Sequence, residues 1–294
     1  MSENIITLKY RDPMVCGGTE ATLNTDAPKE IKSDEMTFFS VTSALSCPDG
    51  TDELGFISAF AAPAGNGTFI FLQKGNRRER SSEWALIKDD VFPFLTSLVK
   101  EYNIAKDNGF YSKTYGLPEN FGGSVDIEYK SGERIGISNN QSPVLSYSAG
   151  KGFAAFFEKA LTRKKVSLPS VSSLTSIRFD EEKDGGIFTH SVLTLCGDGT
   201  AVNEKSRCFD GKTVYNSKKT VSSDEVSKIK ETIESCGLFA WSSLPDTKYS
   251  FEDPKTLTFA FDGGKEIIVK NCRRVPEQIS GGFFKIELEM TVKH

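Results

Sequence analysis

Two stretches of alternating apolar and polar residues lie about 132 residues apart in the chain. Residues 125–137 read VDIEYKSGERIGI, and residues 257–269 read LTFAFDGGKEIIV. In both, the alternation continues to a glycine turn, Ser131-Gly132 in the first and Gly263-Gly264 in the second. A period of two around such a turn predicts a half-buried β-hairpin in each half of the chain.

A second pair of hairpins is predicted around two similar tetrapeptides. Residues 65–68 read GNGT, between apolar runs at 56–60 and 68–72. Residues 197–200 read GDGT, between runs at 187–195 and 200–202. We interpret both as the same tight two-residue turn, in which Asn-Gly or Asp-Gly supplies the positive φ angles. If the second hairpin turns at Asp198-Gly199, Cys208 pairs with Thr189 and faces away from His190.

Helical periodicity follows each of these hairpins. Residues 89–104 and 224–238 carry apolar residues at helical spacing, with Asp89 and Ser223 as expected N-caps and Gly237 as a left-handed C-terminal residue. Apolar spacing in residues 153–161 predicts a closing helix for the first half. In the second half the alternation of Phe284, Ile286, Leu288, Met290 and Val292 predicts a closing strand, and the alternative is a helix equivalent to that of the first half.

These matches favour an internal duplication. We predict an α+β fold of two tandem repeats, each an antiparallel sheet with a helix packed on one face. The first repeat, with an N-terminal extension, covers residues 1–165, and the second covers residues 166–294. The expected boundary lies within residues 161–173, where Ser, Pro and charged residues interrupt the apolar pattern.

The repeats differ by an insertion at residues 105–118, which we expect to be a surface loop. It carries Phe110, Tyr111 and Tyr115, which are candidate binding residues because exposed aromatic side chains often anchor partners. The alternative is that they fold back as a lid over the core. Residues 74–80 form the densest basic stretch, and Arg77 and Arg78 are candidate contacts for an anionic partner. Here the alternative is a solvated loop beside Glu79 and Glu83.

Composition narrows the possible partners. The 294 residues carry a net charge of −4, so nucleic acid has no general electrostatic reason to bind. No run approaches the roughly 18 apolar residues that span a bilayer. The N-terminus lacks the basic and apolar regions of a signal peptide, so we expect a cytoplasmic protein. The six cysteines form no CxxC motif and are expected to be reduced thiols.

Motifs for chemistry are few. Residues 148–152 read SAGKG before a predicted helix and lack the spacing of a phosphate-binding loop, although a helix N-terminus there can hold an anion. Residues 180–185 echo the start of a calcium loop, but Ser191 stands where the bidentate Glu is required. Nucleophilic catalysis would depend on His190, with Cys196 too far along the same strand. We therefore predict no metal site and no cofactor.

Residues 108–137 also contain Gly116-Leu117-Pro118, the hairpin sequence YKSGE at 129–133, and an Asn/Pro turn at 139–143 follows them. With these features the chain resembles a family of uncharacterised proteins of Gram-positive gut bacteria. The resemblance implies strand-rich units and carries no activity, ligand or catalytic residue.

The function predicted from the sequence is a non-enzymatic module that binds a protein or a small molecule. One alternative is a hydrolase that uses acidic residues at a cleft between the repeats. Another is a structural subunit whose sheet edges pair with another chain.

Overall fold

The computed structural model describes residues 5–10, 18–48, 54–65, 67–76, 79–117, 121–183, 186–242, 255–271 and 275–291. The chain divides into two compact units, Met1–Val166 and Ser167–His294. Each unit combines a β-sheet with α-helices, as expected for an α+β protein.

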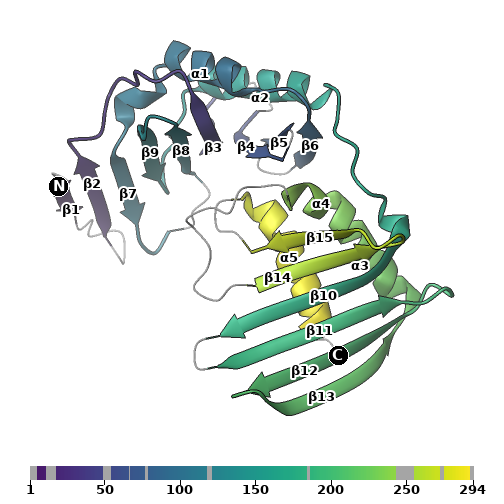
Figure 1. The fold of residues 1–294 in the computed structure, drawn as a ribbon. Coiled ribbons are helices and arrows are strands. Elements are labelled where there is room, and N and C mark those ends of the chain that lie inside the picture. The colour runs from purple at the N-terminus through teal and green to yellow at the C-terminus, as the bar shows by residue number, and fades with distance from the viewer. Residues whose placement is uncertain are drawn as a thin grey trace. The chain divides into compact units, whose positions relative to one another are not determined.

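The first unit contains a nine-stranded sheet in its described residues, with the order β1-β2-β7-β9-β8-β3-β4-β5-β6. Its strands are β1 (Ile5–Tyr10), β2 (Thr19–Asn24), β3 (Met36–Ala44), β4 (Phe56–Ala64), β5 (Gly67–Gly75), β6 (Arg80–Ile87), β7 (Phe110–Thr114), β8 (Gly123–Tyr129) and β9 (Arg134–Asn139). All neighbouring strands are antiparallel except β7 and β9, which are parallel. Helices α1 (Phe92–Glu101) and α2 (Tyr147–Leu161) cover one face of this sheet, and a short 3₁₀ helix, η1 (Ile104–Asp107), follows α1 (Figure 1).

The second unit contains a six-stranded antiparallel sheet with the order β13-β12-β11-β10-β14-β15. Its strands are β10 (Leu174–Lys183), β11 (Ile187–Leu195), β12 (Ala201–Phe209), β13 (Lys212–Val221), β14 (Lys255–Phe261) and β15 (Glu266–Lys270). The 3₁₀ helix η2 (Val171–Ser173) precedes β10. Helices α3 (Ser223–Ser235), α4 (Leu238–Trp241) and α5 (Glu277–Thr291) pack together on the sheet.

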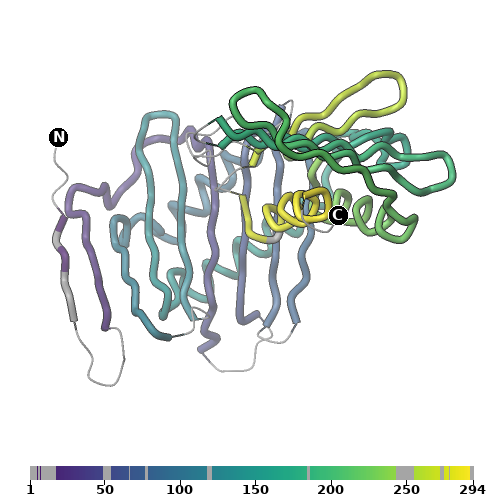
Figure 2. The backbone as a smooth tube through the Cα atoms, turned by 90° about the horizontal axis from the view of Figure 1, so that it is seen from below, coloured from purple at the N-terminus to yellow at the C-terminus, as the bar shows by residue number. Residues whose placement is uncertain are grey.

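Six strands follow the same order in both units. The order β6-β5-β4-β3-β8-β9 in the first matches β13-β12-β11-β10-β14-β15 in the second. A helix follows β6 and β13, and a closing helix follows β9 and β15. The first unit continues beyond β9 with β7, β2 and β1, which form one end of its sheet (Figure 2).

Phenylalanine builds both cores. In the first unit the ring centroid of Phe39 lies 5.1 Å from that of Phe153 and 5.7 Å from that of Phe157, both on α2. In the second unit Phe239 of α4 lies 5.1 Å from both Phe259 and Phe261 of β14. Rings of this size remove much apolar surface from water, which favours the packing of helix on sheet.

The prediction of a C-terminal strand is wrong. Residues 277–291 form helix α5, and its buried side chains are Ile279, Phe283, Ile286 and Met290, spaced at three and four residues. Phe284 and Leu288 are 41% and 45% exposed. Exposed Phe284 and Leu288 lie between buried residues of the helix in the sequence. Apolar residues from two faces of one helix therefore follow each other at every second position, which resembles the period of a strand. Burial of the stripe against the sheet outweighs that local pattern.

Both helix N-caps were predicted one or two residues from their true positions. Helix α1 has Val91 as its N-cap, and Asp90 Oδ1 accepts the N–H of Phe92 at 2.9 Å, whereas Asp89 does not cap the helix. Helix α3 has Ser222 as its N-cap, in a capping box with Glu225, in place of Ser223. Gly237 has a φ of 64°, which confirms the left-handed residue after α3.

The two glycine turns differ in length, so their interpretation as one repeated two-residue turn is wrong. Ala64 pairs with Gly67 in the first hairpin, and Gly65 has a φ of 57°. Leu195 pairs with Ala201 in the second, and the loop between Cys196 and Thr200 ends with Gly199 at a φ of 86°. That loop is the three-residue type with a left-handed last residue.

The longer loop changes the register of β12. Cys208 pairs with Phe188 and not with Thr189. A shift of one residue moves every side chain of a strand to the opposite face of the sheet. Cys208 and His190 therefore share a face, contrary to the prediction.

Candidate binding site

The insertion at residues 105–118 builds regular structure and is not a surface loop. It forms η1 and strand β7, which pairs in parallel with β9 through Tyr111↔Ser138 and Ser112↔Asn139 and antiparallel with β2. Phe110 is half-buried, whereas Tyr111 and Tyr115 are 42% and 45% exposed. The insertion therefore widens the sheet and presents two tyrosines to solvent.

Backbone and ring contacts hold these two tyrosines. The hydroxyl of Tyr111 lies over Gly136, where an added Cβ would come within 2.4 Å of it. The Tyr115 N–H donates to the carbonyl of Gly18 at 3.1 Å, and Lys113 Nζ lies 5.4 Å from the ring centroid of Tyr115. Leu117 and Phe121 are also exposed.

Asn108 anchors the insertion to the rest of the first unit. It is 2% exposed; its Nδ2 donates to the carbonyls of Pro28 and Arg134, and its Oδ1 accepts the N–H of Gly136 at 2.8 Å. The Asn108 carbonyl also accepts a hydrogen bond from Lys29 Nζ. A buried amide that fills its donor and acceptor positions holds three segments in one arrangement.

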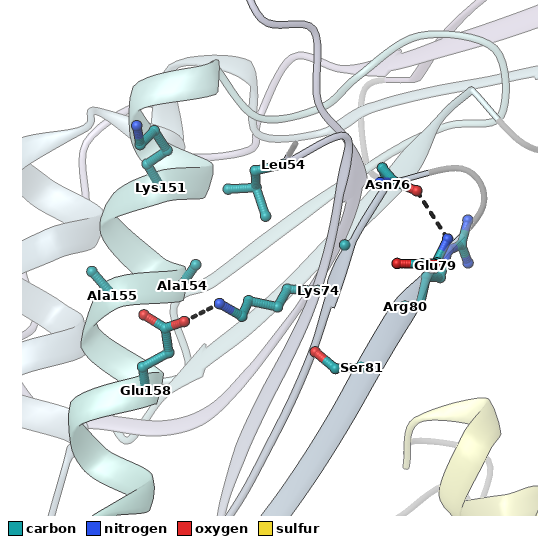
Figure 3. Close-up of a pocket in the computed structure, with 11 residues that line it drawn as sticks. Leu54, Lys74, Asn76, Glu79, Arg80, Ser81, Lys151, Ala154, Ala155 and Glu158 are labelled. Carbon is teal, nitrogen blue, oxygen red and sulfur yellow. Dashed lines mark hydrogen bonds and ion pairs between the residues drawn. The ribbon is translucent and has the colours of Figure 1, made fainter. Parts of the chain in front are cut away.

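A pocket of about 600 Å³ lies between helix α2 and the ends of strands β5 and β6 (Figure 3). Three of its lining residues are cationic, Lys74, Arg80 and Lys151, and two are anionic, Glu79 and Glu158. Its other lining residues are Leu54, Gly75, Asn76, Ser81, Ala154 and Ala155. The charged side chains thus carry an excess of one positive charge.

The pattern of α2 explains why a pocket exists at this position. Ala154 and Ala155 lie three and four residues after Lys151, and Glu158 lies four and three residues after them, so all four lie on one face of the helix. The short side chains of the two alanines leave space above the middle of that face, and the longer side chains of Lys151 and Glu158 lie at its two ends (Figure 3). Lys151, predicted only as part of the SAGKG sequence, thus belongs to the wall of a pocket.

The cations are partly held by neighbouring groups. Lys74 Nζ forms an ion pair with Glu158, and the two side chains are 38% and 46% exposed. The Arg80 guanidinium stacks over Phe56 at 3.8 Å from the ring centroid. Lys151 Nζ lies 5.5 Å from the ring centroid of Tyr147.

The turn beside the pocket is closed by two hydrogen bonds. The Asn76 N–H donates to the carbonyl of Glu79, and the Glu79 N–H donates to Asn76 Oδ1, both at 2.9 Å. Gly75 has a φ of 149°, and a Cβ there would lie 2.1 Å from the Glu79 carbonyl, so the turn requires glycine. The predicted contacts Arg77 and Arg78 lie outside the described residues, but the described members of this basic stretch all line the pocket.

Of the residues considered for metal binding and nucleophilic catalysis, Asp180 lies in β10 and His190 in β11, and Cys196 follows β11. His190 Nδ1 lies 2.6 Å from Asp180 Oδ1, and Arg178 Nε donates to Asp180 Oδ2 at 3.0 Å. Asp180 is thus paired within the sheet, and Asp184 and Gly185 of the same sequence lie outside the described residues. Across the described part of the chain, no three His, Cys, Asp or Glu side chains gather closely enough to hold a metal ion.

A buried ionic cluster lies beneath α5 in the second unit. Lys255 Nζ lies 2.6 Å from Glu287 Oε1 and 3.2 Å from Glu181 Oε1, and the Glu181 side chain is only 8% exposed. Desolvation lowers the pKa of Lys255, but the hydrogen bond to Glu287 and the negative charges of Glu287 and Glu181 together raise it above the ordinary value. The cluster joins β10, β14 and α5 through these ion pairs, so we assign it a structural role.

Comparison with protein-family models and with curated proteins finds no match for this chain. Among the helices that the structure describes, none has the length and apolar character needed to cross a membrane.

Proposed function

We propose that the chain is a non-enzymatic binding module and that the pocket beside α2 binds a small molecule bearing an anionic group. The observation that carries this proposal is the gathering of Lys74, Arg80 and Lys151 around a cavity large enough for a metabolite-sized ligand. Pockets of several hundred Å³ with a few convergent polar groups are the usual form of small-molecule sites.

In the ion pair between Lys74 and Glu158, a ligand anion can take the place of the Glu158 carboxylate. Ion pairs with this degree of exposure contribute about 0–1 kcal/mol, so a ligand anion can replace the Glu158 carboxylate at little cost. Arg80 is held in place by stacking on Phe56 and offers a planar set of donors suited to phosphate or carboxylate. Ala154 and Ala155 leave room between these charges for the body of the ligand.

The same module is proposed to consist of two copies of one ancestral unit. The identical order of six strands, the helices at the same two places in that order and the similar hairpin sequences support this. The copies differ at the pocket, because α5 presents Phe284 and Lys285 about 130 positions after Ala154 and Ala155. An anion site built on the two alanines is therefore assigned to the first unit alone.

Titration calorimetry with pyrophosphate, with citrate and with glucose as a neutral ligand tests the proposal. We expect the two anions to bind, with affinity that falls as salt is added, and glucose not to bind. Lys74→Ala and Lys151→Ala should each weaken anion binding by about tenfold, because each removes one charge-assisted contact. Glu158→Gln should strengthen it, because the competing carboxylate is gone.

The matched control is Lys130→Ala. Lys130 is an exposed lysine of the same unit, ion-paired with Glu35 at 2.7 Å and remote from the pocket lining. If Lys130→Ala weakens binding as much as Lys74→Ala does, the anion is attracted by general surface charge and the pocket is not the site.

A further inference from the structure

Strand β15 is the outermost strand of its sheet, in contrast to its counterpart in the first unit. The described residues place β14 on one side of β15 and no strand on the other. At the same place in the first unit, β9 is followed by β7, β2 and β1. An open edge of this kind exposes backbone groups that can pair with another strand.

The register shows which backbone groups face the open side. The Phe261 N–H bonds to the Lys265 carbonyl and the Asn271 N–H bonds to the Lys255 carbonyl, so odd-numbered residues of β15 face β14. Glu266 and Ile268 alternate with them and direct their N–H and C=O groups to the open side. Their side chains lie on the sheet face opposite to buried Ile267 and Val269, and Ile268 is 49% exposed.

The first unit shows how such groups are satisfied. Gly136 of β9 occupies the position of Ile268, about 132 residues earlier, and the strand order around it is the same. Its N–H donates to Asn108 Oδ1 and its carbonyl accepts the N–H of Gly109. The insertion therefore occupies in the first unit the side that β15 leaves open in the second.

The sequence of β15 is complementary to itself in the antiparallel direction. It reads Glu-Ile-Ile-Val-Lys, with Ile268 at its centre. If two copies pair antiparallel about Ile268, Ile268 faces its own equivalent, and Glu266 faces Lys270 of the partner subunit. Opposite charges directly across an antiparallel pair stabilise it, and like charges destabilise it.

We propose that β15 pairs antiparallel with β15 of a second copy of this chain, joining two six-stranded sheets into one across a twofold axis at Ile268. The contact is isologous, since the same residues contribute from both sides. It is independent of the anion pocket, which lies in the other unit. Because five-residue strands bury little area, we expect a reversible dimer whose population rises with concentration.

Sedimentation velocity across a series from micromolar to millimolar protein tests the proposal. We expect the wild-type chain to pass from monomer to dimer over this range. Ile268→Pro removes the N–H at the centre of the contact, and proline is tolerated where an edge strand faces solvent, so this variant should remain folded and monomeric. A circular-dichroism spectrum like that of wild type establishes that it is folded.

Charge exchange distinguishes this contact from any other. Glu266→Lys places lysine opposite lysine, and Lys270→Glu places glutamate opposite glutamate, so each should weaken dimerisation by roughly tenfold. The double variant E266K/K270E should restore the wild-type dissociation constant, and an equimolar mixture of the two single variants should form a heterodimer. Lys212→Glu makes the same charge change on β13, at the other edge of the sheet, and should have no effect.

Two results would overturn the proposal. One is a chain that stays monomeric at millimolar concentration, which would leave the β15 edge to another partner. The other is a dimer that survives Ile268→Pro or ignores the charge exchange, which would place the contact on another surface.

Discussion

The two units share six strands in one order and differ in how the sheet ends. In the first, an insertion supplies β7, and the N-terminal segment supplies β2 and β1, so β9 is an interior strand. In the second, β15 is the last strand that the structure describes on that side. In the first unit, the segment after α1 and η1 thus covers the side of β9 that has no described strand at the matching place beside β15.

The units also differ where the sheet meets the closing helix. At one register position the first unit pairs Ser43 with Gly123, and the second pairs Glu181 with Lys255. The buried Ser43 hydroxyl accepts the N–H groups of Val144 and Leu145 just before α2, whereas Lys255 joins Glu287 of α5. The first unit fixes its helix with neutral hydrogen bonds and the second with charges.

The largest expected effect comes from removing Lys255 from its ion pairs with Glu181 and Glu287. Lys255→Met removes the cation that Glu181 and Glu287 share, and Glu181 keeps the ion pair with Lys183 at 3.4 Å. The loss should lower the free energy of unfolding of the second unit by about 3 kcal/mol. Because the pKa of Lys255 is raised, its contribution is complete at neutral pH and is lost only as pH rises above the ordinary lysine value of 10.5.

Fluorescence can follow the second unit alone, because Trp241 is its only tryptophan and Trp84 is that of the first. Urea unfolding in a Trp84→Phe background therefore measures the effect of Lys255→Met. Lys285→Met, an exposed lysine on the same helix, is the control and should change stability by less than about 0.5 kcal/mol. Equal effects of the two variants would contradict the role given to the cluster.

A smaller effect is expected from loosening the extra strands of the first unit. Asn108→Ala leaves the Gly136 N–H and two carbonyls without their partner, which should cost about 2 kcal/mol. The loss should concentrate in β7, β2 and β1, since Asn108 joins them to β9. Hydrogen exchange resolved by strand measures this, and uniform loss of protection that includes β4 and β5 would disagree with it.

The smallest effect concerns the hairpin turn before β9. The Glu133 carboxylate accepts the N–H groups of Lys32 and Ser33 and the Ser131 hydroxyl, and the turn of the second unit has Lys265 at this position. The hydrogen bond from the Lys32 N–H lowers the pKa of Glu133 the most. Desolvation opposes this shift, and the hydrogen bonds from Ser131 and Ser33 add to it. Its contribution is complete above the ordinary value of 4.5 and is lost as pH falls through the lower folded value.

Glu133→Gln should therefore reduce stability at pH 7 by under about 1 kcal/mol, because the residue is only partly buried and water screens its charge. The difference from wild type should shrink in thermal denaturation below pH 4. A difference that persists unchanged into acid would show that charge is not the cause.

The hairpins, the first closing helix and the helix at 223–235 were predictable because each carries one clear period beside a glycine turn or a cap. Strands β6 and β13 were missed, since β13 is exposed along nearly its whole length and shows no apolar alternation. Helix α5 was misread because Phe284 and Leu288 are apolar yet exposed. Local pattern does not distinguish a buried apolar side chain from an exposed one.

The sequence predicted one wall of the pocket but not the pocket itself. The described residues of the basic stretch at 74–80 form one wall of the pocket, and the stretch was predicted as a contact for an anionic partner. Lys151 lies on the opposite wall and was considered only as part of a phosphate-binding loop. Bringing Lys74 beside Glu158 depends on a helix that begins more than 70 residues later, and no local signal specifies such a distance.

The pairing of β2 with β7 has a consequence for the order of folding. Thr19 and Thr114, whose hydroxyls lie 2.9 Å apart across these strands, are separated by 95 residues in the chain. Closing so long a loop before its contacts form is entropically costly. We therefore expect the six-stranded part of the first unit to form early, and its N-terminal strands to dock late and to open first under native conditions.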